Sequence, residues 1–140
     1  MRTIAQKRAE YALEQVLKIP KITDDFRSFS ASAPSMILQN GFGQTMAFWY
    51  QKGSKKDKVR KDIIVDTDDK HIRLLNIVKN WLSLKNGDIN NKYIKKTEEI
   101  KIFLAELSKM EQQDYLAAQE ETLRLLEWVK RYANAGLNNV

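Results

Sequence analysis

Apolar residues recur every three or four positions along most of this 140-residue chain, and only two prolines and five glycines interrupt the pattern. The first segment shows the spacing clearly, with Ala5, Ala9, Ala12 and Val16 on one side of a helix. A chain of this size buries roughly two-thirds of its unfolded surface, which is enough for one core. The pattern predicts an all-α fold, a compact bundle of about five to six antiparallel helices in a single domain spanning residues 1–140.

Prolines set the expected helix boundaries in the first half of the chain. The first helix should stop near Ile19, because the residue before Pro20 is disfavoured in helical conformation. A short second helix should cover residues 24–29 and begin at a Thr or Asp cap. Pro34 is well suited to a first helical turn, so it should open a third helix that runs to about residue 51.

Capping residues set the expected boundaries in the second half. The acidic run at 66–69 should open a fourth helix that ends at Asn86 and Gly87. A fifth helix should contain Ile94, and the capping-box spacing of Ser108 and Glu111 should open the last helix, which ends near Gly136. Residues 63–65 are too short to start a sheet, so no strand is predicted and about 52–65 should form a loop.

The residue inventory argues against catalysis. The chain has no cysteine, and its single histidine, His71, is expected on the surface near a helix cap without a partner at zinc-binding or catalytic spacing. Gly41 and Gly43 form an isolated GxG that indicates a close helix approach or a kink rather than a dinucleotide site. The acidic pairs at 24–25, 68–69, 98–99 and 120–121 should lie near helix starts or on solvated faces. We expect a non-enzymatic chain with no catalytic residue, metal, cofactor or small-molecule substrate.

Positive charge is concentrated in one half of the chain. Residues 1–61 hold 12 Lys or Arg and 5 Asp or Glu, whereas residues 62–140 hold 12 and 13. The densest run is a basic loop broken only by Asp57, with the cations Lys52, Lys55, Lys56, Lys58, Arg60 and Lys61. Such a loop can neutralise RNA phosphates, although a solvated loop that only confers solubility is an equal alternative.

Two smaller sets of residues are further candidates for binding. Arg124, Lys130 and Arg131 should form a smaller basic cluster on the last helix, a further candidate for nucleic-acid contact, and Arg2, Lys7 and Arg8 should form a patch on the first helix. The aromatic candidates for a subunit interface are Trp49, Tyr50 and Trp128. Core positions are the alternative for all three, and Trp49 and Tyr50 could instead stack on bases beside the basic loop.

Two stretches carry a likeness to a known family. The first runs from Pro34 to Trp49 and reads P-x-M-I-x-x-N-G, followed by A-F-W. The second runs from Tyr115 to Ala133 and reads Y-x(5)-E-T-L-x-L-L-x-W-V-K-R-Y-A. Together with Arg8-Ala9-x-x-Ala12-Leu13, they resemble the small subunit of the type III-B CRISPR (Cmr, RAMP-module) effector complex. The positions that match are Pro34, Met36, Ile37, Asn40, Gly41, Ala47, Phe48, Leu126, Trp128, Lys130 and Arg131.

The resemblance implies a role in antiviral defence. Members of that family are all-helical and non-catalytic, and they stack in several copies along the backbone subunits of the complex. It implies as partners the other Cmr subunits, further copies of this chain, and guide and target RNA. Lys130 and Arg131 are then candidates for RNA or subunit contact, whereas the basic loop matches no family motif and rests on its charge alone.

One function of a different class is left open. A stand-alone helical adaptor that binds a protein partner would also show helices without reaction chemistry, and its basic charge would be incidental. No apolar run approaches the roughly 20 residues of a membrane helix, so we expect a cytoplasmic protein without a membrane partner.

Overall fold

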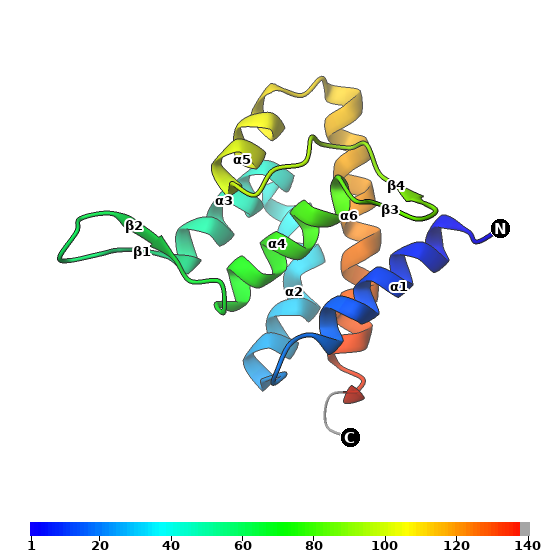
Figure 1. Cartoon of the computed structure of the whole chain (residues 1–140), viewed down its shortest axis with the longest axis horizontal. Helices are drawn as coiled ribbons and strands as arrows, with labels where there is room; N and C mark the ends of the chain where they lie inside the picture. The colour runs from blue at the N-terminus through cyan, green and yellow to red at the C-terminus, as the bar shows by residue number, and fades with distance from the viewer. Residues whose placement is uncertain (138–140) are drawn as a thin grey trace.

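Six helices make up most of the computed structural model, which describes residues 1–137 (Figure 1). They are α1 (Ile4–Leu17), α2 (Asp24–Asn40), α3 (Phe42–Gly53), α4 (Lys70–Leu82), α5 (Ile100–Lys109) and α6 (Gln112–Ala133). Two small antiparallel hairpins join them, β1 (Ser54–Lys56) with β2 (Ile63–Val65) and β3 (Lys85–Asn86) with β4 (Ile89–Asn90). The predicted all-α bundle is confirmed.

The 22-residue helix α6 organises the bundle, because α1, α2 and α4 all pack against it (Figure 1). Helix α3 packs against α2, α4 and α5 on the other side of the core. The largest fully buried side chains include Trp49, Trp81, Phe42 and Phe103. Within residues 1–137, no helix is both long enough and apolar enough to span a bilayer.

Helix starts follow the capping residues of the sequence. Thr3 and Gln6 form a complete capping box at the start of α1. Asp69 caps α4, because its Oδ2 accepts hydrogen bonds from the backbone N–H groups of His71 and Ile72. The acidic start predicted for the fourth helix is therefore correct.

The predicted boundary at Pro34 is wrong, because Pro34 lies buried inside α2. A proline lacks the N–H that would bond to the carbonyl of Ser30, so an interior position is usually costly. Burial of Ala33 and Ile37 on either side holds the helix together here. The chain breaks instead at Gly41, whose φ of 88° and ψ of 157° suit glycine alone. The predicted kink at the glycines is found at this point.

The expected loop at 52–65 contains a strand pair. Ser54, Lys55 and Lys56 pair with Val65, Ile64 and Ile63. Residues 63–65 are too short to form a sheet alone, but residues 54–56 of the same chain supply the second strand. The fourth helix also ends earlier than predicted, at Leu82, because Asn86 and Gly87 belong to the β3–β4 hairpin. Gly87 has a φ of 60° at the first turn position, where short hairpins favour glycine.

The last two helix boundaries also shift. Ser108 lies inside α5 and Glu111 is the N-cap residue of α6, so the predicted capping box is absent. Ile94 is buried in an extended segment before α5 rather than in a helix. Helix α6 ends at Ala133, three residues before the predicted stop at Gly136.

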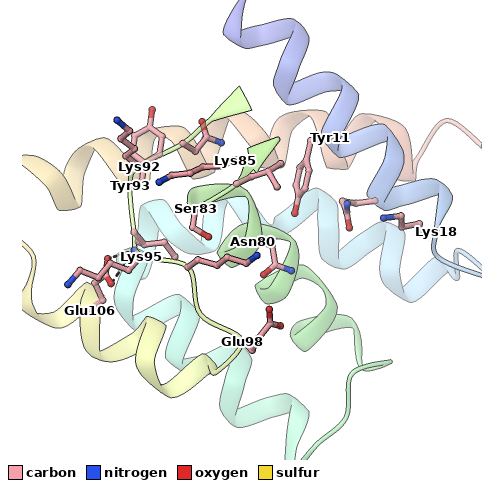
Figure 2. Close-up of a pocket in the computed structure, with 15 residues that line it drawn as sticks. Tyr11, Lys18, Asn80, Ser83, Lys85, Lys92, Tyr93, Lys95, Glu98 and Glu106 are labelled. Carbon is pink, nitrogen blue, oxygen red and sulfur yellow. Dashed lines mark hydrogen bonds between the residues drawn. The ribbon is translucent and has the colours of Figure 1, made fainter. Parts of the chain in front are cut away.

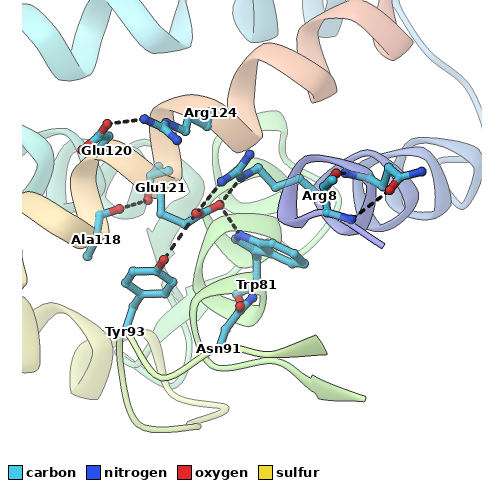
Figure 3. Close-up of polar contacts among 11 residues, drawn as sticks. Arg8, Trp81, Asn91, Tyr93, Ala118, Glu120, Glu121 and Arg124 are labelled. Atoms are coloured by element: carbon cyan, nitrogen blue, oxygen red, sulfur yellow. Dashed lines mark hydrogen bonds and ion pairs between the residues drawn. The ribbon is translucent and has the colours of Figure 1, made fainter. Parts of the chain in front are cut away.

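A buried ion pair joins α1 to α6 (Figure 3). Arg8 and Glu121 are each 5% exposed, and the Arg8 Nε and Nη2 atoms donate to the Glu121 carboxylate. The same carboxylate accepts from Trp81 Nε1 at 3.0 Å and from the Tyr93 hydroxyl at 3.4 Å. Hydrogen bonding to Glu121 raises the pKa of Arg8 above its ordinary value, so the guanidinium stays charged. Placing Arg8 in a surface patch and Glu121 on a solvated face was wrong.

Candidate interaction surfaces

The basic loop forms a β-hairpin that extends away from the helices (Figure 1). Lys52 is exposed at the end of α3, with its Nζ 5.5 Å from the centre of the Phe48 ring. All the remaining predicted cations of the loop are exposed on β1 or the turn: Lys55, Lys56, Lys58, Arg60 and Lys61. The structure therefore places five of the six cations on one projecting hairpin, and Lys52 lies at its base.

The one acidic residue within the basic run is neutralised by a neighbour. Asp57 Oδ2 accepts a hydrogen bond from Arg60 Nε at 2.9 Å, and Oδ1 accepts one from the backbone N–H of Val59. The Arg60 bond holds the pKa of the Asp57 carboxyl below its ordinary value. Lys61 takes a φ of 61°, which closes the turn. Asp57 is therefore paired with Arg60 and not with a lysine of the hairpin.

The hairpin also carries exposed apolar side chains. Val59 is 88% exposed, Ile63 58% and Ile64 44%. Residues 63–65 were expected only as a short β-branched patch, and the exposure of Ile63 and Ile64 follows from the two-stranded pairing, which has no helix packed over it. Val59 lies in the turn between the two strands. A surface that combines lysines with isoleucines can contact both an anion and an apolar protein surface.

The predicted cluster on α6 is mostly ion-paired. Arg124 lies 2.5 Å from Glu120, and Lys130 lies 3.9 Å from Glu127, in each case one turn along the same helix. Arg131 is exposed and has no ion pair within the described part of the chain. Exposed pairs of this kind are weak, so a polyanion can compete for these cations.

The three predicted interface aromatics differ in accessibility. Trp49 is fully buried, with 0% of its surface exposed, and packs edge-on against Phe29. It lies in the core and cannot reach a partner, so its assignment to an interface is corrected. Tyr50 is half-buried, and half-buried Trp128 stacks on Tyr132 with ring centres 5.8 Å apart.

One basic surface was missed in the sequence. A groove of about 900 Å³ runs between α1, the C-terminal end of α4 and residues 91–98 (Figure 2). Its five lysines come from separate parts of the chain: Lys18, Lys85, Lys92, Lys95 and Lys96. Their spacing in the sequence gives no signal, because only the packing of α1 beside the extended segment brings them together.

His71 lies where the sequence predicted, in the first turn of α4, but it is half-buried rather than on the surface. Its Nδ1 lies 3.1 Å from Asp69 Oδ2, and its ring lies 4.6 Å from that of Phe29. Across residues 1–137, no three His, Cys, Asp or Glu side chains gather where they could hold a metal ion.

Comparison with known proteins gives a consistent result. Residues 4–136 match the family described as CRISPR-associated protein (Cas_Cmr5). Among solved structures, the chain is similar to the crystal structure of a CRISPR-associated Cmr5 family protein from Thermus thermophilus. The two share 21% sequence identity with a TM-score of 0.60, over 98% of this chain and 99% of the other. At that identity, the structural match supports the fold.

Proposed function

The chain belongs to the Cas_Cmr5 family and is thus a subunit of the type III-B CRISPR (Cmr) complex, in which we propose that it is a non-catalytic RNA-contacting subunit. In this proposal, copies of the chain stack along the backbone subunits and support the binding of guide and target RNA. Sequence is read by base pairing between the two RNAs, as in other RNA-guided systems. Family membership sets aside the stand-alone adaptor.

The observation that supports the RNA contact is the projecting β1–β2 hairpin with its five cations, next to Lys52 at the end of α3. Because Arg60 compensates Asp57, the lysines remain available to phosphates. The cations project from a short ribbon, so they can approach an RNA backbone without moving a helix. Binding through phosphates is independent of base sequence, which suits a subunit that must accept any guide.

The exposed apolar residues of the hairpin support contact with a neighbouring subunit. Val59, Ile63 and Ile64 would lose water on docking, and each fully buried side chain of this size contributes about 1.5–3 kcal/mol. Half-buried Trp128, stacked on Tyr132, offers a second aromatic contact on α6. The non-catalytic part of the proposal rests on the residue inventory, in which the single histidine is engaged by Asp69 and Phe29.

The test uses the assembled Cmr complex with a hairpin variant that carries Lys55→Ala, Lys56→Ala, Lys58→Ala and Arg60→Ala. If the three lysines meet phosphates of single-stranded RNA while Arg60 pairs with Asp57, the slope of log affinity against log salt should fall by about 2. The affinity for target RNA should drop most at low salt, where the lost contacts contribute most. Filter binding over a salt series measures both quantities.

A matched control removes four cations that belong to no candidate surface: Lys21→Ala, Arg73→Ala, Lys101→Ala and Lys109→Ala. It changes the net charge equally but should leave the salt slope near that of the wild type. Circular dichroism checks that both variants fold. An unaltered slope for the hairpin variant, in a complex that still incorporates it, would show that the hairpin does not contact RNA.

A further inference from the structure

We propose that the lysine groove, the cavity between α1, the end of α4 and residues 91–98, is a second binding site for the sugar–phosphate backbone of single-stranded RNA. This inference rests on the proposed RNA-contacting function and adds a site to it. The groove is separate from the hairpin. Its volume of about 900 Å³ is far larger than a single phosphate needs, and its cations are spread over α1, β3 and the extended segment.

The five groove lysines are exposed and uncommitted. Within residues 1–137, no ion pair or hydrogen bond involves the Nζ atoms of Lys18, Lys85, Lys92, Lys95 or Lys96. Two half-buried cations near the surface are compensated instead, Arg2 by Asp88 and Lys70 by Asp25. The fold does not use these five ammonium groups, so they are free to bind an anion.

The acidic residues of the groove do not cancel this charge. Glu106 accepts hydrogen bonds from the backbone N–H of Lys95, at 3.0 and 3.3 Å, and thereby helps to hold the extended segment. Glu98 is the other carboxylate of the lining. Five lysines against two carboxylates leave the lining with a positive charge (Figure 2).

The segment that carries three of the lysines is fixed against α4. Buried Lys79, which is 2% exposed, donates from its Nζ to the carbonyl of Thr97 at 2.7 Å. Asn91 Nδ2 donates to the carbonyl of Trp81 at 2.7 Å, and the backbone N–H of Tyr93 donates to Leu82. The backbone beneath Lys92, Lys95 and Lys96 is therefore held in place before any ligand arrives.

Neutral side chains between the lysines suit a single strand. Tyr93 is half-buried at the groove, and the side chains of Gln15 and Ser83 line it without a hydrogen bond to another described residue. Proteins that hold single-stranded nucleic acids without sequence preference combine a positive groove with aromatic rings and polar groups. The lining matches that combination.

The β1–β2 hairpin precedes α4, and β3 follows its other end (Figure 1). Because Ser83, Leu84 and Lys85 line the groove, the groove and the hairpin lie at opposite ends of α4. Because α4 has 13 residues, the two surfaces are separated by roughly 20 Å. That separation allows each surface to be tested by its own variant.

The test measures binding of a fluorescent oligouridylate to the full chain, by polarisation, over a series of salt concentrations. The groove variant carries Lys85→Ala, Lys92→Ala, Lys95→Ala and Lys96→Ala. We expect at least a roughly tenfold loss of affinity at low salt and a salt slope smaller by about 3. The control with Lys21, Arg73, Lys101 and Lys109 replaced by Ala should keep the wild-type slope.

Lysine acetylation, read by mass spectrometry, gives a second readout on the unmodified chain. Bound oligouridylate should protect the groove lysines from acetylation but leave Lys101 and Lys109 reactive. Loss of binding only in the hairpin variant, with protection only at the hairpin, would overturn the groove and leave the proposed function standing. If the chain bound no RNA, or if neither variant changed binding, the groove site and the proposed RNA-contacting function would both be contradicted. Equal protection of the groove lysines by inorganic phosphate would overturn a strand-binding site.

Discussion

Removing the Glu121 carboxylate tests whether the buried ion pair holds the bundle together. In Glu121→Ala, the guanidinium of Arg8 would stay in a site that is 5% exposed, without its counter-charge. Trp81 Nε1 and the Tyr93 hydroxyl would lose their acceptor at the same time. Contacts from two other helices and one extended segment all end on this one side chain.

The size of the effect follows from stranding a buried charge. Breaking a buried pair by removing one partner costs about 3–5 kcal/mol. For a chain of this length that lowers the melting temperature by roughly 10–20 °C. With a urea m-value of about 2 kcal/mol/M, the unfolding midpoint should fall by roughly 2 M.

Two companion variants separate the charge from the packing. Arg8→Met combined with Glu121→Leu removes both charges and keeps apolar volume, so it should lose no more than about 1–3 kcal/mol, mainly from the orphaned Trp81 N–H. Glu120→Ala removes an exposed neighbour and should cost about 1 kcal/mol or less. Urea unfolding followed by circular dichroism measures all three. If the double variant were as unstable as Glu121→Ala, the cost would come from the lost hydrogen bonds of Trp81 and Tyr93, and the charge argument would fail.

Two further predictions concern the backbone and the termini. Gly41→Ala should lower the free energy of unfolding by about 1–3 kcal/mol, because a φ of 88° and ψ of 157° strain any side chain although nothing lies within 4 Å of the added Cβ. An unchanged urea midpoint would contradict this. The hydrogen bond from Arg2 holds the pKa of Asp88 below its ordinary value of 3.8, so Arg2→Ala should raise that pKa, as read by carboxyl NMR titration. The stability that the pair adds should be complete above pH 3.8 and disappear as the pH falls through the lower, folded pKa; an Asp88 pKa that does not move would refute the pair.

The sequence predicted helices well where local chemistry decides them. Asp69 starts α4 because a carboxylate side chain can satisfy free N–H groups without help from the rest of the fold. Pro34 failed as a boundary because burial of α2 against α6 outweighs the one backbone hydrogen bond that proline omits. Local preferences such as the helix-breaking tendency of proline are overridden where a long helix packs against several neighbouring elements.

Buried charges were missed for a different reason. Glu121 follows Ala118 by three residues and precedes Leu125 by four, so the helical spacing itself places it on the apolar stripe. Because Glu121 was considered only as an acidic pair with Glu120, its helical spacing from the buried apolar residues was overlooked. Lys79 repeats the pattern on α4, where it follows buried Leu75 by four residues.

One candidate surface could be predicted from the sequence, and the other could not. The hairpin cations are nearly consecutive, so the sequence located them before their strand pairing was known. Four of the five groove lysines come from the half of the chain whose charges nearly cancel. Charge counted along the chain cannot reveal a surface that exists only after α1 packs beside residues 91–98.

A backbone hydrogen bond closes the base of the β1–β2 hairpin, so the length of the hairpin tip can vary between related sequences. The backbone N–H of Asp66 bonds to the carbonyl of Gly53 at 2.9 Å, so α3 and α4 are joined at that point whatever lies beyond it. Lengthening the tip between Lys56 and Ile63 then adds only a loop-closure entropy that grows with the logarithm of its length. Insertions can accumulate there between relatives, and a reporter sequence can be grafted there, without rebuilding the bundle.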